Sequence, residues 1–156
     1  MKPNITMIGM PSSGKSTVGV LLAKRLGFSF IDVDIVIQEK EGRLLKEIIA
    51  DEGMDGFLEV ENRINAGLEA KMSVIAPGGS VIYGEEAMAH LKEISEIVYL
   101  KMSYEEMEKR IEMVQRRVGD LKLDFGNPRK IKKQKREDLE ESLDKYGDFD
   151  IIVCGH

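Results

Sequence analysis

Short apolar runs alternate with segments of helical spacing along most of this chain. The apolar runs predict strands over residues 4–9, 28–31, 73–76, 96–100 and 149–153. Apolar positions three or four residues apart predict a helix that ends near residue 26 and further helices over about 35–41, 44–51, 56–71, 85–92 and 136–146. Ser103, with Glu106 three residues later, has the pattern of a capping box and predicts the start of one more helix. The alternation indicates an α/β fold in one domain over residues 1–156.

A chain with this alternation folds into a mostly parallel sheet with helices on both faces, here with five strands. Right-handed crossovers bring the carboxyl ends of parallel strands to one edge of the sheet, and open sheets bind their ligands at that edge. Three segments directly follow predicted strands, at residues 9–17, 32–34 and 77–80. We therefore expect these three segments to converge on an active site.

The segment after the first strand has the pattern G-x-x-x-x-G-K-[ST] of a phosphate-binding P-loop. Small residues let successive backbone N–H groups point inward, and the following helix N-terminus adds positive charge. Lys15 can then reach the outer phosphates, and the Ser16 hydroxyl can bind Mg²⁺. The predicted nucleotide-binding residues of the loop are Pro11, Ser12, Ser13, Gly14, Lys15, Ser16 and Thr17. One apolar face of the helix after the loop is predicted from Val18, Leu21, Leu22 and Leu26.

Two aspartates directly follow the second strand. Beside a P-loop, Asp32 can hold Mg²⁺, directly or through water, and Asp34 can accept a proton from an alcohol. The alternative is that one of these aspartates caps the N-terminus of the next helix, which is a common role for Asp. The position beside the P-loop favours the functional interpretation.

The turn after the third strand, Pro77-Gly78-Gly79-Ser80, contains two glycines. Glycines let a ligand approach the backbone closely, although such a turn can also be a plain connection from strand to helix. The place of this turn at the ligand-binding edge of the sheet favours a binding site.

Residues 115–135 lack a hydrophobic period and contain several helix breakers and many basic residues. Long irregular segments in compact domains are often lids over an active site. A solvated basic loop is the alternative, and we prefer it for most of the lysines. Arg116 or Arg117, near the end of the preceding helix, is the better candidate for a phosphate contact.

Composition excludes several other classes of function. The net charge of −5 and the absence of Trp argue against a protein that binds nucleic acid. A single cysteine, Cys154, excludes an internal disulfide and a cysteine metal cluster, and it fits a reducing compartment. The sequence shows no long apolar run that would indicate a membrane partner, and no signal peptide that would indicate secretion. We expect a monomeric cytoplasmic protein.

Together these motifs resemble the shikimate kinase family, within the P-loop nucleoside-monophosphate-kinase-like group. The matching features are the loop at residues 9–17, the Asp32 and Asp34 pair, the segment from Gly53 through Phe57 to Glu61, the Gly78-Gly79 turn and the basic lid. The resemblance implies a three-layer P-loop sandwich with strand order 2-3-1-4-5. It also implies phosphoryl transfer from ATP, with Mg²⁺, to a hydroxyl of a small metabolite, namely shikimate.

On the nucleotide side, the resemblance assigns roles to five residues. It implies that Lys15 stabilises the transferred phosphoryl group and that Ser16 and Asp32 organise Mg²⁺. Arg117 is implied to be the catalytic lid arginine, and Arg110 is implied to stack on adenine.

On the acceptor side, the resemblance implies that Asp34 meets the reacting hydroxyl and that Gly78 and Gly79 touch the acceptor. It implies that Arg136 binds the carboxylate of the acceptor. We expect Leu58 to face the acceptor. In the family pattern F-R-x-x-E this position is an arginine, which also binds the carboxylate of the acceptor. The loss of such a pair typically costs ~2–5 kcal/mol.

The acceptor half of the chain departs from the family pattern at further positions. Ser80 replaces a third glycine, and the lid reads Arg116-Arg117-Val118-Gly119-Asp120-Leu121 in place of the usual R-P-L-L. The alternatives to a shikimate kinase are therefore a kinase for another small polar acceptor and a catalytically inactive ATP-binding regulatory module. The complete set of phosphoryl-transfer residues favours an active enzyme.

Overall fold

The computed structural model describes residues 2–10, 13–118 and 133–154, and it leaves the side chains of residues 111, 114–118 and 133–136 undescribed. Strands and helices alternate along the chain as the hydrophobic pattern predicts. In chain order the elements are β1 (Asn4–Gly9), α1 (Lys15–Leu26), β2 (Ser29–Asp32), α2 (Val33–Glu41), α3 (Leu45–Ala66), β3 (Ser73–Ala76), the short 3-10 helix η1 (Val81–Tyr83), α4 (Glu85–Ile94), β4 (Ser95–Lys101), α5 (Tyr104–Val118), α6 (Lys133–Tyr146) and β5 (Ile151–Cys154).

The strands form one sheet with the order β2-β3-β1-β4-β5, and all four pairings are parallel. This confirms the five-stranded parallel sheet and its predicted strand order. β1 lies in the centre, where Gly9 pairs with Leu100 of β4, and Asp32 at the end of β2 pairs with Ala76 at the end of β3. The carboxyl ends of β1, β2 and β3 therefore lie together at one edge of the sheet.

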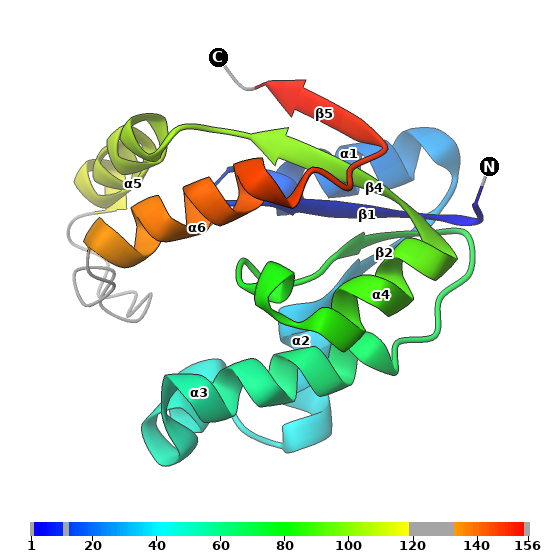
Figure 1. Cartoon of the computed structure of the whole chain (residues 1–156), viewed down its shortest axis with the longest axis horizontal. Helices are drawn as coiled ribbons and strands as arrows, with labels where there is room; N and C mark the ends of the chain where they lie inside the picture. Colours follow the sequence, from blue (N-terminus) through cyan, green and yellow to red (C-terminus); the bar gives the residue numbers. More distant parts are fainter. Residues whose placement is uncertain (1, 11–12, 119–132, 155–156) are drawn as a thin grey trace.

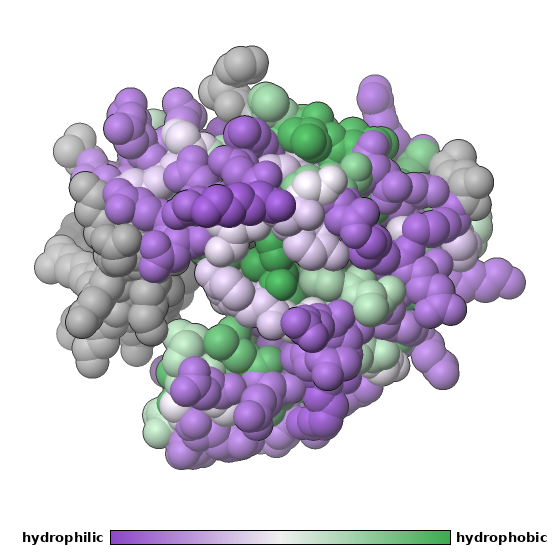
Figure 2. Space-filling model, in the orientation of Figure 1, coloured by the Kyte–Doolittle hydropathy of each residue, from purple (hydrophilic) through white to green (hydrophobic). Residues whose placement is uncertain are grey.

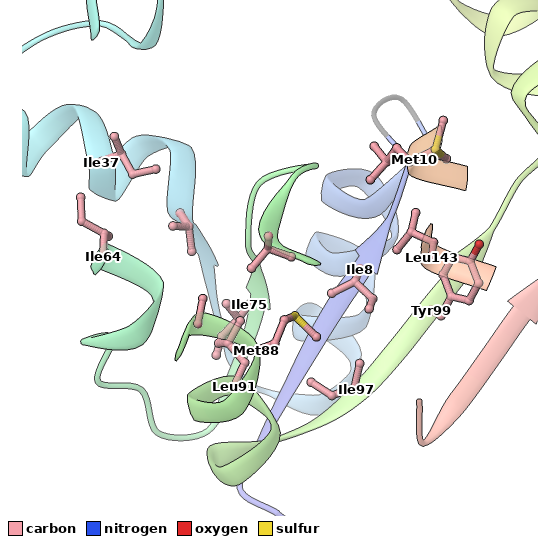
Figure 3. Packing of buried hydrophobic residues seen from close by; sticks show 14 of the residues in the cluster. Ile8, Met10, Ile37, Ile64, Ile75, Met88, Leu91, Ile97, Tyr99 and Leu143 are labelled. Atoms are coloured by element: carbon pink, nitrogen blue, oxygen red, sulfur yellow. The ribbon is translucent and has the colours of Figure 1, made fainter. Parts of the chain in front are cut away.

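Helices cover both faces of the sheet, as predicted (Figure 1). Alternate residues of each central strand point to opposite faces, because successive side chains in a strand alternate. Ile8, Ile75 and Ile97 belong to the larger apolar cluster, together with Met88 and Leu91 of α4 (Figure 3). The smaller cluster on the other face contains Met7, Val74 and Val98 from the strands and Ala23 from α1.

The predicted apolar face of α1 is wrong. Val18, Leu21 and Leu26 are exposed, with Leu21 60% exposed, whereas the buried residues of this helix are Gly19 and Ala23. The helix packs so closely on the sheet that a Cβ on Gly19 would lie 2.8 Å from Cε2 of Phe30. Small residues therefore determine which face is buried here, and hydrophobic periodicity does not detect them.

One predicted helix end and part of one predicted irregular segment are also wrong. The helices predicted over about 44–51 and 56–71 form α3, and the break predicted between them is confirmed by the non-helical backbone of Gly53 (φ 74°, ψ 178°). The second of these helices ends earlier than predicted, at Ala66. Residues 115–118, predicted to be irregular, continue α5 to Val118. The predicted cap at Ser103 is confirmed, because its Oγ accepts a hydrogen bond from the backbone N–H of Glu106 at 3.2 Å.

Apolar surface is exposed at one edge of the sheet. Ile151, Ile152 and Val153 of β5 are all exposed, and a hydrophobic patch lies over this strand in Figure 2. The surface of α6 in the same view is mostly hydrophilic. Within the described ranges, no helix combines the length and the apolar character that a membrane crossing requires.

Candidate active site

The P-loop lies between the central strand and the first helix, as the sequence predicts. β1 ends at Gly9, and Gly14 precedes α1 in a left-handed conformation (φ 93°). A Cβ on Gly9 would lie 2.6 Å from the carbonyl oxygen of Leu100, so only glycine lets the chain leave the sheet so close to β4. The first turn of α1 thus begins at the carboxyl edge of the central strand, where its free N–H groups can bind phosphate.

The Lys15 side chain folds back over this loop. Its ammonium group donates hydrogen bonds to the carbonyl oxygens of Gly9, at 2.9 Å, and of Met10, at 2.7 Å. Burial lowers the pKa of Lys15 to about 8, while the nearby carboxylates of Asp34 and Glu61 act in the opposite direction. A desolvated ammonium interacts with an anion more strongly than an ammonium in water does.

A pocket of about 220 Å³ opens beside Lys15. It brings together the ends of β2 and β3 and the starts of α1 and α2, and its lining residues are Lys15, Ser16, Asp32, Asp34, Ala76, Pro77, Gly78 and Gly79. The convergence of three distant segments, predicted from the parallel topology, is confirmed. Two of the proposed acceptor residues, Gly78 and Gly79, line this pocket together with Lys15 of the P-loop.

The two aspartates after β2 have different surroundings. Asp32 caps α2, because its Oδ1 accepts a hydrogen bond from the backbone N–H of Asp34 at 3.0 Å. It lines the pocket as well, so the capping interpretation and a role in the site are compatible for this residue. Burial and the neighbouring carboxylate of Asp32 raise the pKa of Asp34, and Lys15 partly opposes this shift.

Glu61 is a buried acid to which neither the sequence motifs nor the family resemblance assigns a role. Its side chain on α3 is 2% exposed, and its carboxyl lies against the Gly78 backbone. Burial and the charge of Asp34 raise the pKa of Glu61 to about 8, although Lys15 lowers it. The detectable signal was an acid on a helix face whose neighbours Phe57, Val60 and Ile64 are apolar.

Leu58 is half-buried on α3 and does not belong to the lining of the pocket. The neighbouring Asn62 does not face the pocket either. Its side chain donates to Glu86 at 2.8 Å and accepts from the backbone N–H of Ala87 at 3.0 Å, which fixes α3 against the start of α4. Asn62 therefore serves the packing of α3 on α4, whereas Glu61 lies behind the pocket wall at Gly78.

The residues present fit a nucleotide with Mg²⁺. Mg²⁺ prefers oxygen ligands and usually takes only one or two from the protein, with phosphate and water as the others. Ser16 and Asp32 lie in one pocket and offer a hydroxyl and a carboxylate, and the described residues contain no larger group of acidic, His or Cys ligands. Ser13 Oγ, in the loop, is buried and has no hydrogen-bond partner among the described residues, so it is available to a phosphate oxygen.

Several predicted site residues lie wholly or partly outside the described residues. These are Pro11 and Ser12 of the loop, residues 119–132 of the predicted lid, and the side chains of Arg117 in α5 and Arg136 in α6. Arg110 is described, and its Nη1 lies 3.8 Å from the position that a Cβ on Gly14 would take. It is therefore close to the P-loop, whereas Thr17 is exposed at the start of α1.

Known proteins match almost the whole chain. A family model described as "Shikimate kinase" matches residues 11–152. Shikimate kinase from Persephonella marina is 34% identical over 155 residues, which cover 96% of this chain and 87% of that protein. Shikimate kinase from Moorella thermoacetica is 41% identical over 111 residues, which cover 70% of this chain and 64% of that protein.

A solved structure agrees with these sequence matches. Shikimate kinase from Acinetobacter baumannii, in complex with shikimate, superposes with a TM-score of 0.78 at 29% identity, and the match covers 100% of this chain and 85% of that one. The P-loop and the shared pocket are those of an ATP-dependent kinase with an alcohol as acceptor. Within that class, the chain belongs to the shikimate kinase family. Enzymes of this family use ATP and Mg²⁺.

Proposed function

We propose that this chain transfers the γ-phosphoryl group of ATP to a hydroxyl of shikimate. The observation that carries the proposal is that Lys15 and Ser16 line the same pocket as Asp32, Asp34 and Gly78. In-line phosphoryl transfer needs donor and acceptor side by side, so groups that bind phosphate and groups that bind a hydroxyl must face one small volume. The family of the chain, and the shikimate complex of the A. baumannii relative, support shikimate as the acceptor.

In this proposal each residue of the pocket has one task. Lys15 exchanges its hydrogen bonds to the loop carbonyls for bonds to the transferred phosphoryl oxygens. Asp34 accepts a hydrogen bond from the acceptor hydroxyl and aligns its oxygen for attack. Ser16 and Asp32 would hold Mg²⁺, with Asp32 oriented by its bond to the backbone of Asp34. Bound ATP and Mg²⁺ supply the phosphoryl group and neutralise its charge.

Three arginines complete the proposed site. We infer that Arg110, beside the P-loop, packs on the adenine of the nucleotide. Arg117 would close over the phosphates, and Arg136 would bind the carboxylate of shikimate. The acidic net charge and the single cysteine support a monomeric cytoplasmic enzyme that needs neither nucleic acid nor a membrane.

Leu58 favours a second candidate, which is phosphorylation of another small polar acceptor. An aliphatic side chain cannot form a bidentate bond with a carboxylate. An acceptor with less negative charge would lose less from the presence of Leu58 than shikimate does. The two candidates share the nucleotide half of the site and differ only in the acceptor.

The test is ADP release by the purified protein with ATP and Mg²⁺. The acceptor panel contains shikimate, sugars, amino-alcohols and nucleoside monophosphates. We expect turnover with shikimate, and a loss of at least ~10²-fold in kcat for Lys15→Met. Lys24→Met, an exposed lysine on the same helix, is the matched control and should retain the activity. ATP binding without turnover on any acceptor would refute the proposal, and turnover with another acceptor alone would support the second candidate.

A further inference from the structure

Glu61 is the buried ionisable group that the proposed mechanism leaves unused. It lies on α3 and is 2% exposed. Among the residues that the structure describes, none forms a hydrogen bond or an ion pair with its carboxyl group. The next polar group along this face, Asn65, donates to the backbone oxygen of Glu61 at 3.0 Å and leaves the carboxyl free. A buried carboxyl in this condition needs an explanation, because burial without a partner is costly.

The carboxyl of Glu61 meets the acceptor side of the pocket at Gly78. A Cβ on Gly78 would lie 2.4 Å from Glu61 Oε2 and 3.4 Å from Asp34 Oδ1. Since both oxygens surround the same point, they lie at most about 6 Å apart, within the range at which like charges disturb each other. Gly78 thus allows a second carboxyl to stand directly behind the residue proposed to accept the acceptor hydroxyl.

The charges around Glu61 favour its neutral form. Asp34 faces it from α2 and disfavours a second negative charge, and Lys15 faces it from α1 with the opposite effect. On α4, Glu86 is held by Asn62. Leu58, on the same helix, supplies no positive charge. Burial and Asp34 together outweigh Lys15 and raise the pKa of Glu61 to about 8.

We propose that Glu61 acts as a neutral carboxylic acid behind the Gly78 wall. In this form it adds no charge beside Asp34, which acts as the carboxylate at the acceptor hydroxyl. Two carboxyls whose surroundings separate their protonation states take different roles, one as acid and one as base. Ionisation of Glu61 would place a second negative charge beside the phosphoryl acceptor and weaken its binding. This role rests on the proposed function, because it concerns how the acceptor hydroxyl is held.

The first test measures the protonation of Glu61 in the folded protein. Glutamate carboxyl carbons labelled with ¹³C are titrated by NMR in the wild type and in Glu61→Gln, and the resonance that disappears in the variant is that of Glu61. We expect its midpoint near pH 8, far above the ordinary value of 4.5. A midpoint near the ordinary value would overturn the inference.

The second test compares Michaelis constants for shikimate and for ATP at pH 7 and pH 9. In the wild type the constant for shikimate should rise about fivefold between these pH values, and in Glu61→Gln the rise should disappear. At pH 7 Glu61→Gln should bind shikimate more tightly than Glu61→Ala, since an amide reproduces the shape and neutrality of the protonated acid. The Michaelis constant for ATP is measured in parallel, because Lys15 also loses its charge in this pH range.

Glu59→Gln is the matched control, because Glu59 is exposed on the same helix and undergoes the same chemical change. It should keep the pH dependence of the wild type. Equal pH dependence in Glu61→Gln and the wild type would refute this role of the neutral acid. An inactive wild type would refute the proposed function and this role with it, whereas an active wild type with an ordinary Glu61 titration would refute only the role of Glu61.

Discussion

Gly78→Ala tests whether the wall of the pocket is as tightly built as the structure indicates. The new methyl group would lie 2.4 Å from Oε2 and 2.9 Å from Cδ of Glu61, whereas an ordinary contact is about 3.4 Å or longer. The Glu61 carboxyl, which belongs to a buried residue of α3, must therefore move by about 1 Å. Overpacking of this kind typically destabilises a fold by ~1–3 kcal/mol. We expect about 1–2 kcal/mol, since the end of one side chain can yield before the backbone does.

A double-mutant cycle tests whether the Glu61 carboxyl causes this loss of stability. Glu61→Ala removes both atoms that the new methyl group would meet, and it leaves Asp34 Oδ1 at an ordinary 3.4 Å. In the Glu61→Ala background, Gly78→Ala should therefore cost less than ~0.5 kcal/mol, which gives a coupling energy of about 1 kcal/mol or more. The measurement is urea unfolding at pH 7, with the slope m checked to be the same in all four proteins.

The control is Gly67→Ala, where the nearest atom to the new Cβ would be the carbonyl oxygen of Arg63 at 3.6 Å. This ordinary contact predicts a change below ~0.5 kcal/mol in the free energy of unfolding. The same cost for Gly78→Ala in both backgrounds would show that Glu61 is not the group that the methyl group displaces. In that case the carboxyl of Glu61 does not pack tightly behind the pocket wall at Gly78.

Four further outcomes follow from the structure. Leu58→Arg should lower the Michaelis constant for shikimate about tenfold without changing that for ATP, and no change would place residue 58 outside the acceptor site. Gly19→Ala should cost ~1–3 kcal/mol in urea unfolding, since its Cβ would lie 2.8 Å from Phe30. The Michaelis constant for ATP should rise above pH 8, where Lys15 loses its proton, and a constant value to pH 10 would contradict this. Because folding raises the pKa of Glu61 from 4.5 to about 8, the free energy of unfolding should fall across this pH range in the wild type and less in Glu61→Gln.

Much of the nucleotide half could be predicted from the sequence, because its chemistry is local. The spacing of Gly9, Gly14 and Lys15 specifies a phosphate loop, and the apolar runs on either side of it specify strand and helix. Parallel topology then requires the ends of β1, β2 and β3 to meet at one edge of the sheet. The strand order rested on the resemblance to a family, since no local pattern contains it.

The surfaces that face one another could not be predicted, because they depend on distances between segments far apart in the sequence. The buried face of α1 is the face with Gly19 and Ala23, since close approach to Phe30 outweighs the gain from burying larger residues. The sequence determined that Lys15, Asp32 and Asp34 could handle phosphate and Mg²⁺. Only the tertiary structure placed the carboxyl of Glu61 against Gly78 and beside Asp34, because α3 and the turn after β3 meet only once the chain has folded.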